Sequence, residues 1–262
     1  MNDLKEAVRD IENTFAALQY PAGFLEKYDQ LECLAASHGT ETFLVKQKNS
    51  EQLFVAKCYD KAYYAVIHES SILQSLHHNG LPAFADEFQN DTTICIVREY
   101  IEGQPLNQYI KDNSLTNQDM IGFGLQLCDI LTYLHTQENP VIHRDIKPQN
   151  IIVKDDGQIV LIDFDISRIY QSEAETDTQF FGTRDYAPPE QYGFSQTDAR
   201  TDIYSFGVLL RYMLTGNEKE NHGVHVYKPL ERIIRKCTSF APKERFRDVA
   251  ALKRALLSAN PK

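Results

Sequence analysis

The sequence predicts an α+β fold in which a β-rich part precedes a larger helical part. Two observations support this prediction. Short β-prone runs at 42–45, 52–55 and 93–97 lie within the first hundred residues. Apolar residues at helical spacing then recur over 115–136 and 203–214. We therefore expect the strands to gather in the first part of the chain and the long helices in the second.

Composition excludes several classes of protein. The chain has 262 residues, of which 42% are hydrophobic, which is enough to bury a core and excludes disorder and fibres. A formal net charge of −10 argues against nucleic acid or an acidic membrane as the main partner. No apolar run approaches the roughly 20 residues that span a bilayer, and the acidic N-terminus does not resemble a signal peptide. The expected location is therefore cytoplasmic.

The cysteines suggest a reducing environment. The five cysteines are scattered, their number is odd, and none forms a CxxC pair; they are Cys33, Cys58, Cys95, Cys128 and Cys237. This pattern favours reduced thiols over a disulfide framework or a zinc site.

Residues 1–27 are predicted to form a helical N-terminal extension. Apolar residues share one helical face from Leu4 to Leu18, and Tyr20-Pro21 ends the pattern. Such a helix either packs back on its own domain or serves as a dimerisation or partner helix.

The most informative stretch runs from His143 to Asp165. Asp145 is a carboxylate placed to accept a proton, and two short β-prone runs then flank an Asp-Gly turn, which predicts a hairpin. A hairpin brings its ends together, so Asn150 and Asp163 should lie side by side. An amide oxygen next to a carboxylate makes a hard oxygen site, which suits Mg²⁺.

Five motifs in order make the chain resemble the eukaryotic-like (Hanks-type) serine/threonine protein kinases, most closely the compact kinases of bacteria. They are Val55-Ala56-Lys57, Glu69 in its predicted helix, His143-Arg144-Asp145 with Asn150, Asp163-Phe164-Asp165, and Ala187-Pro188-Pro189-Glu190. The resemblance implies a bilobal protein-kinase fold with ATP in the cleft. Its N-lobe would span 28–98, its hinge 99–104 and its helical C-lobe 105–262.

The resemblance also assigns roles to residues. Asp145 would accept the proton of the substrate hydroxyl, and Lys147 would steady the γ-phosphate. Lys57 would pair with the α- and β-phosphates and with Glu69, although a lysine at a strand end can also be simply exposed. Asn150 and Asp163 would hold Mg²⁺. The remaining positions expected around ATP, besides Lys57, are Ala35, Thr42, Val55, Glu99, Ile101 and Ile152.

Three departures from the family pattern leave other functions open. The three glycines of the phosphate loop fall on Ala35, Ser37 and Thr40, and only Gly39 remains, off register. These changes, with Arg98 and Asp165, favour a pseudokinase that acts as a binding or scaffold module. A small-molecule phosphotransferase is a third hypothesis, weakened by Lys147, Thr183 and the Ala-Pro-Pro-Glu segment.

Arg98 stands at the gatekeeper position, which is usually apolar. A guanidinium behind the nucleotide pocket is costly unless it is paired. Arg98 therefore either pairs with Glu69 or Asp163 and holds an inactive state, or extends to water. Asp165 replaces a glycine, and this change either narrows the switching of the motif or is simply tolerated.

Residues 166–186 are polar and fit an activation segment. Thr176 and Thr178 are expected autophosphorylation sites with Arg144 as the receptor of the phosphate, although a plain solvated loop explains the same composition. Thr183 is expected to form hydrogen bonds near Asp145 and Lys147. Glu190 and Arg245 match the buried ion pair of the family. The expected partner is a protein substrate.

Overall fold

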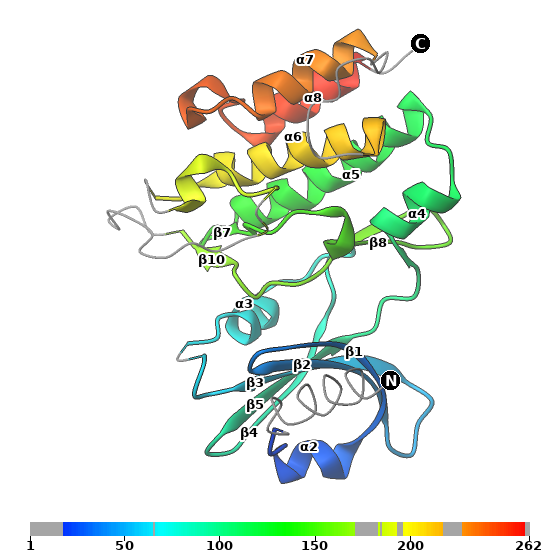
Figure 1. The fold of residues 1–262 in the computed structure, drawn as a ribbon, viewed down its shortest axis with the longest axis vertical. Helices are drawn as coiled ribbons and strands as arrows, with labels where there is room; N and C mark the ends of the chain where they lie inside the picture. Colours follow the sequence, from blue (N-terminus) through cyan, green and yellow to red (C-terminus); the bar gives the residue numbers. More distant parts are fainter. Residues whose placement is uncertain are drawn as a thin grey trace, which may run out of the picture. The chain divides into compact units, whose positions relative to one another are not determined.

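The computed structural model describes residues 18–64, 66–170, 183, 185–192, 196–216 and 227–259. It divides the chain into two compact units, each described separately below (Figure 1). The first comprises Met1–Ser70 and Ala83–Tyr100, and the second Ser71–Pro82 and Ile101–Lys262. The helix predicted for residues 4–18 lies outside the described residues apart from its last position. Thr176 and Thr178 lie outside them as well.

The first unit contains a five-stranded antiparallel sheet with the strand order β1-β2-β3-β5-β4. The strands are β1 (Tyr28–Ser37), β2 (Thr40–Gln47), β3 (Leu53–Asp60), β4 (Phe84–Gln89) and β5 (Thr93–Glu99). The β-prone runs of the sequence therefore form three adjacent strands, β2, β3 and β5, which confirms that part of the prediction.

A short helix, α2 (Ala22–Lys27), packs against one face of this sheet (Figure 1). Its buried Phe24 joins an aromatic cluster with Tyr28, which meets Phe54 edge to face at a centroid distance of 5.5 Å. Lys27 and the hydroxyl of Tyr28 both bond to Asp86 on β4. The junction of α2 and β1 is thus tied to β4 at the far edge of the sheet.

A disulfide between Cys58 and Cys95 crosses the centre of the sheet. These residues are direct partners in the register of β3 and β5, and both are fully buried. The prediction of reduced thiols throughout was wrong for this pair, because sequence spacing does not reveal which residues become cross-strand neighbours. Cys33, Cys128 and Cys237 are free.

Thiol counting tests this bond. Alkylation of the protein unfolded in denaturant without reductant should modify three of the five cysteines, the free residues Cys33, Cys128 and Cys237. The mass of the intact protein gives the count. A Cys58→Ser variant should expose Cys95 to the reagent, and addition of reductant should make every cysteine of the wild type reactive. Complete alkylation of the wild type without reductant would contradict the bond.

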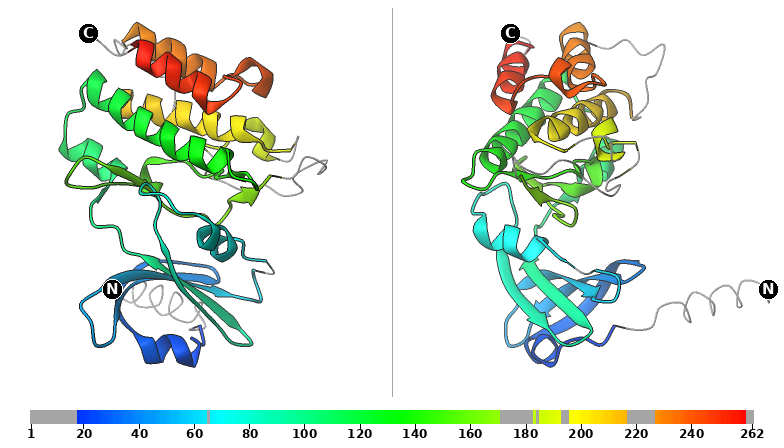
Figure 2. Two further views of the ribbon diagram at one scale, coloured as in Figure 1. Left: turned by 180° about the vertical axis from the view of Figure 1, so that it is seen from behind. Right: turned by 90° about the vertical axis from the view of Figure 1, so that its left-hand side faces the viewer.

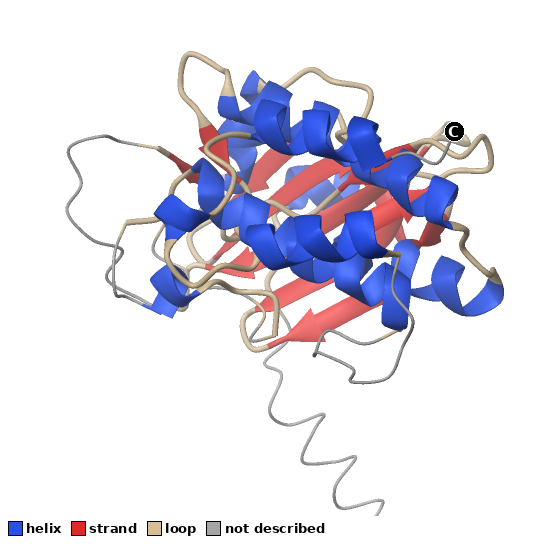
Figure 3. Ribbon diagram, turned by 90° about the horizontal axis from the view of Figure 1, so that it is seen from above, coloured by secondary structure: helices blue, strands red, loops and turns tan. Residues whose placement is uncertain are grey.

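The second unit is mainly helical, and its long helices run alongside one another (Figures 2 and 3). The α-helices that lie wholly within it are α4 (Leu106–Asp112), α5 (Asn117–His135), α6 (Ala199–Thr215), α7 (Lys228–Cys237) and α8 (Val249–Ala259). Another helix, α3 (Glu69–Ser75), begins in the first unit and ends in the second. α5 contacts α6 and α8, and α6 contacts α7.

Side chains cap the N-termini of the two longest helices, α5 and α6. α5 begins after Thr116, whose hydroxyl accepts from the backbone N–H of Asp119 while the Asp119 carboxylate accepts from the N–H of Thr116. α6 begins at Ala199 with Asp198 as its cap, one turn earlier than predicted, and this places Asp202 inside the first turn. Asp198 was the signal that the sequence analysis missed.

Short strands and turns complete the second unit. β6 (Gln104–Pro105), β8 (Ile151–Val153) and β9 (Ile159–Leu161) form one small sheet, and β7 (Val141–Ile142) pairs with β10 (Arg168–Ile169). The 3₁₀ turns are η1 (Pro148–Asn150), η2 (Pro189–Tyr192) and η3 (Pro242–Glu244). β8 and β9 are the predicted hairpin, and Gly157 takes a left-handed φ of 78° in its turn.

The predicted ion pair between Glu190 and Arg245 is confirmed. Two parallel bonds of 2.6 and 2.9 Å join the guanidinium to the carboxylate, and both residues are buried. Arg245 also donates to the carbonyls of Arg200 and Ser239. Thr201 donates to Glu190 at 3.0 Å. The pair therefore ties η2 to α6 and to the loop before α8.

Removing one partner of this pair should destabilise the protein strongly. Arg245→Met leaves the Glu190 carboxylate buried without its cation, so the free energy of unfolding should fall by about 3–5 kcal/mol. Urea denaturation measures the change. Arg247→Met is the matched control, because Arg247 pairs with Asp248 at the surface and its side chain is 79% exposed; we expect it to cost under about 1 kcal/mol. Equal losses in both variants would contradict the assignment.

Candidate active site

The loop from His143 to Asn150 is held by a single carboxylate. Asp202, fully buried in α6, accepts the backbone N–H groups of His143 at 2.9 Å and Arg144 at 2.8 Å. The ring Nε2 of His135, at the end of α5, lies 2.7 Å from the same carboxylate. Arg144 adopts a left-handed φ of 67°, which the two backbone bonds help to maintain.

Burial and neighbouring groups determine the protonation states of Asp202 and His143. Burial alone raises the pKa of Asp202, but the hydrogen bond and charge of His135 and the N–H of Arg144 outweigh it and hold that pKa below its usual range. Burial lowers the pKa of the His143 imidazole, against the opposing charges of Asp202, Asp145 and Asp163. Asp202 is therefore ionised and His143 neutral at pH 7.

This arrangement makes stability fall in mild acid. The pKa of His143 is lower in the folded state than its unfolded value of about 6.5. Below that pH the unfolded chain binds the extra proton, so the free energy of unfolding decreases by up to about 1.4 kcal/mol per pH unit. The depressed pKa of Asp202 adds its own loss only at much lower pH.

Urea unfolding at pH 7.5, 6.5 and 5.5 measures that slope. A His143→Tyr variant retains an aromatic ring that can meet Phe164, which the imidazole contacts edge to face at 4.9 Å. It removes the titrating nitrogen, so its slope should be shallower than that of the wild type. Identical slopes would show that His143 does not titrate on unfolding.

Asp145 lies at the centre of a compact hydrogen-bonded group. Its Oδ2 accepts from Lys147 Nζ at 2.7 Å and from Asn150 Nδ2 at 2.9 Å. Its Oδ1 accepts from the Thr183 hydroxyl at 2.8 Å, and Lys147 also donates to Thr183 at 2.9 Å. The expected position of Thr183 is therefore confirmed. The carboxylate is oriented by three donors at the edge of a buried loop.

The ends of the predicted hairpin meet as expected. The backbone N–H of Ile162 donates to the carbonyl of Asn150 at 2.8 Å, so Asp163 follows directly beside Asn150. The Asn150 amide nitrogen donates to both the carbonyl and the carboxylate of Asp145, which identifies its Oδ1 as the remaining acceptor of the side chain. Asp163 has a left-handed φ of 71°. An amide oxygen and a carboxylate presented in this way fit a hard divalent cation such as Mg²⁺.

The two residues after Asp163 differ in burial. Phe164 is fully buried against His143. Asp165 is exposed, and its backbone φ is not in the left-handed region. Apart from glycines, the described residues with a left-handed φ are Asn49, Arg144 and Asp163. The backbone at Asp165 therefore needs no glycine in this conformation, which favours a tolerated substitution.

In the first unit, cross-strand register gathers three of the expected nucleotide positions. Ala35 on β1 is paired with Thr42 on β2, and Thr42 with Lys57 on β3. Directly opposed residues share one face of a sheet, so these three side chains form a row. Val55 lies two residues before Lys57 on the same face, and Glu99 ends β5. In the second unit, Ile152 is buried in β8 and Ile101 follows Tyr100.

The glycine-poor loop is a tight hairpin turn made by His38 and Gly39. Gly39 has a φ of 76°, and a Cβ there would lie 2.7 Å from a ring carbon of Tyr63. Ser37 ends β1 and Thr40 begins β2. The remaining glycine is thus required by the turn and by the close approach of Tyr63.

Arg98 and Glu69 have separate partners. Arg98 Nη1 donates to the backbone carbonyl of Glu99 at 3.2 Å in an exposed bond. Glu69 Oε2 accepts the hydroxyl of Tyr59 at 2.6 Å. For the pairing with Glu69, the structure favours the alternative in which Arg98 extends toward water. Sequence reasoning missed Tyr59; its place two residues after Lys57, on the same strand face, was the available signal.

Two arginines, Arg144 and Arg168, lie near each other in and beyond the Asp145 loop. Arg144 Nε donates to the carbonyl of Ile166 at 2.6 Å. Burial and the nearby charge of Arg168 lower the pKa of Arg144 to about 10, against the charge of Asp202. The charge of Arg168 is therefore close enough to act on the Arg144 guanidinium.

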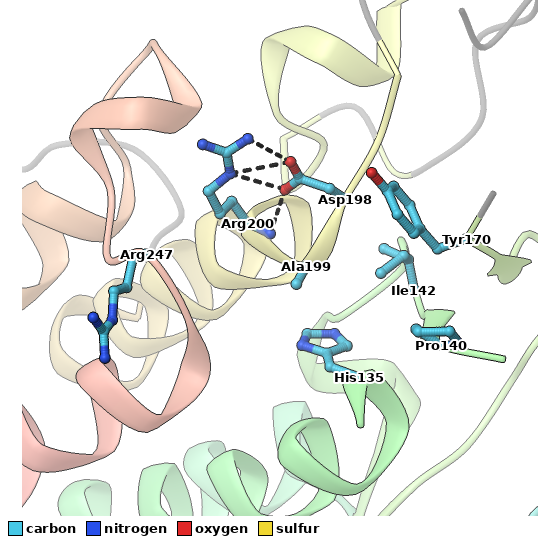
Figure 4. A pocket seen from close by; sticks show the side chains of 8 residues that line it. All are labelled: His135, Pro140, Ile142, Tyr170, Asp198, Ala199, Arg200 and Arg247. Atoms are coloured by element: carbon cyan, nitrogen blue, oxygen red, sulfur yellow. Dashed lines mark hydrogen bonds and ion pairs between the residues drawn. The ribbon is translucent and has the colours of Figure 1, made fainter. Parts of the chain in front are cut away.

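A cavity of about 360 Å³ opens next to the same loop (Figure 4). His135, Pro140 and Ile142 line it from one side. The ion pair of Asp198 with Arg200 lies opposite, with Tyr170 beside it. The nitrogen Nε2 of His135 is engaged by Asp202, so this cavity borders the support of the loop and not the Asp145 carboxylate.

Comparison with known proteins finds relatives of this chain. The family model described as "Protein kinase domain" matches residues 31–260. The chain is 32% identical over 182 residues to serine/threonine-protein kinase cds1 of Schizosaccharomyces pombe, covering 67% of this chain and 39% of that protein. It is 32% identical over 205 residues to serine/threonine-protein kinase B of Synechocystis, covering 69% and 35%.

The chain thus spans less than half the length of these curated relatives. Within the described residues, no helix combines the length and apolar character that crossing a membrane requires.

Proposed function

We propose that this chain, which belongs to the protein kinase domain family, transfers the γ-phosphate of ATP to serine or threonine hydroxyls of proteins. The observation that most supports the proposal is the group formed by Asp145, Lys147, Asn150 and Thr183, in which each polar atom has a role in such a transfer. Phosphoryl transfer depends mainly on positioning and on stabilising charge, so a small group of this kind is sufficient.

Each residue has its own role in the proposed phosphoryl transfer. The substrate hydroxyl gives its proton to Asp145 while its oxygen forms a bond to the γ-phosphorus, and ADP leaves with the electrons of the broken P–O bond. Lys147 stabilises the charge on the transferred group. Thr183 fixes the carboxylate and the ammonium with respect to each other. Bound Mg²⁺, held by Asn150 and Asp163, would neutralise charge on the phosphates.

The nucleotide positions of the first unit support the same proposal. The row of Ala35, Thr42 and Lys57 lies on one sheet face and includes one cation, which suits an adenine nucleotide with its phosphates. The carbonyl of Glu99, already bonded to Arg98, keeps its second lone pair for an adenine amino group. Autophosphorylation at Thr176 or Thr178, with the new phosphate near Arg144 and Arg168, belongs to this proposal.

Labelled-phosphate transfer tests the function. Purified protein with Mg²⁺ and γ-labelled ATP should label itself and a generic basic protein. Asp145→Asn should reduce the rate by roughly 10²–10⁴-fold, because it removes the proton acceptor. Asp155 is an exposed carboxylate in the β8–β9 turn. The variant Asp155→Asn is therefore the matched control and should retain full activity.

The outcomes separate the hypotheses. Label that disappears only in Asp145→Asn supports a kinase, and peptide mapping then shows whether Thr176 or Thr178 receives it. Absence of label in the wild type, with nucleotide binding detected as a thermal shift, would refute the proposal in favour of a pseudokinase. Equal labelling of wild type and Asp145→Asn would remove Asp145 from the mechanism.

A further inference from the structure

Tyr59 is a buried tyrosine whose hydroxyl reaches a residue of the proposed catalytic set. It lies on β3, two residues after Lys57, and is 2% exposed. Its hydroxyl donates to Glu69 Oε2 at 2.6 Å, at the start of α3. Both residues belong to the first unit, so the contact is internal to it.

The hydrogen bond from Tyr59 compensates the Glu69 carboxylate for its removal from water. Glu69 is only 1% exposed, and a carboxylate removed from water is costly unless donors compensate it. A hydroxyl that donates to an ionised carboxylate forms one of the stronger hydrogen bonds in proteins. It occupies one carboxylate oxygen and leaves Oε1 for a second donor.

The ring of Tyr59 is itself held in place. It meets Tyr64 edge to face at a centroid distance of 5.3 Å and an interplanar angle of 72°. The ammonium of Lys57 lies 5.8 Å from the centroid of the same ring. One rigid side chain therefore touches both members of the expected Lys57–Glu69 pair, through its face and through its hydroxyl.

We propose that Tyr59 is a positioning residue for phosphoryl transfer, whose hydroxyl fixes the Glu69 carboxylate so that Oε1 is presented to Lys57. This inference rests on the proposed kinase function. Tyr59 acts through Glu69 and Lys57 and does not touch the reacting atoms. Its substitution should therefore slow transfer without weakening the binding of the protein substrate.

Tyr59→Phe tests the inference because it retains the ring and removes only the hydroxyl. With Mg²⁺, ATP and a basic protein, kcat should fall about tenfold while KM for the basic protein stays within twofold. Tyr64→Phe is the matched control. Its ring packs on Tyr59, but in the part of the chain that the structure describes its hydroxyl has no hydrogen-bond partner. Its kcat should stay within twofold of the wild type.

A double-mutant cycle shows whether the effect passes through Glu69. Urea unfolding of wild type, Tyr59→Phe, Glu69→Leu and the double variant should give non-additive changes, because either single substitution already removes the bond between Tyr59 and Glu69. This measurement needs no catalysis and remains informative if a variant is inactive. Additive changes, or a kcat of Tyr59→Phe within twofold of the wild type, would overturn the inference.

Failure of the proposed function gives a different result. A wild-type protein that transfers no phosphate refutes the kinase proposal and, with it, any positioning role in transfer. An active wild type with an unaffected Tyr59→Phe variant refutes only the role of Tyr59. A loss of kcat in Tyr64→Phe equal to that in Tyr59→Phe would assign the effect to ring packing and would also overturn the inference.

Discussion

The buried carboxylate of Asp202 is the contact on which the geometry of the Asp145 loop depends. Without a charged acceptor inside α6, the backbone N–H groups of His143 and Arg144 would be buried without partners. The left-handed φ of Arg144 would then lose the hydrogen bonds that stabilise it. That turn directs the chain so that Asp145 follows at the edge of the loop. The side chain of Asp202, fixed in helix α6, thus determines the backbone direction from which the Asp145 carboxylate extends.

The two units achieve order in their sites by different means. In the second unit, side chains satisfy one another: Asp145, Lys147 and Thr183 form a closed group, and Asn150 joins it through its amide. In the first unit, order comes from the backbone, because sheet register alone aligns Ala35, Thr42 and Lys57. Substitutions in a side-chain group act on neighbours directly, whereas a register-based row tolerates changes in any one side chain.

Sequence reasoning succeeded where a pattern is local. The β8–β9 hairpin follows from two β-prone runs around an Asp-Gly turn, and helix α5 from its apolar spacing. The motif resemblance correctly placed Thr183 beside Asp145 and paired Glu190 with Arg245. It could not reveal contacts specific to this chain. The meeting of Cys58 with Cys95, and of Tyr59 with Glu69, depends on which side chains the folded sheet brings together.

The disulfide has a topological consequence for the chain between its ends. Cys58 and Cys95 are separated by 37 positions, and the segment between them contains α3 with Glu69 and all of β4. That segment is a covalently closed loop. If the protein were pulled from its two termini, tension would pass through the bond between β3 and β5, and the loop would bear no force until the bond broke. Helix α3 is therefore mechanically shielded, and at up to roughly 3.6 Å per residue the enclosed length would extend only under reducing conditions.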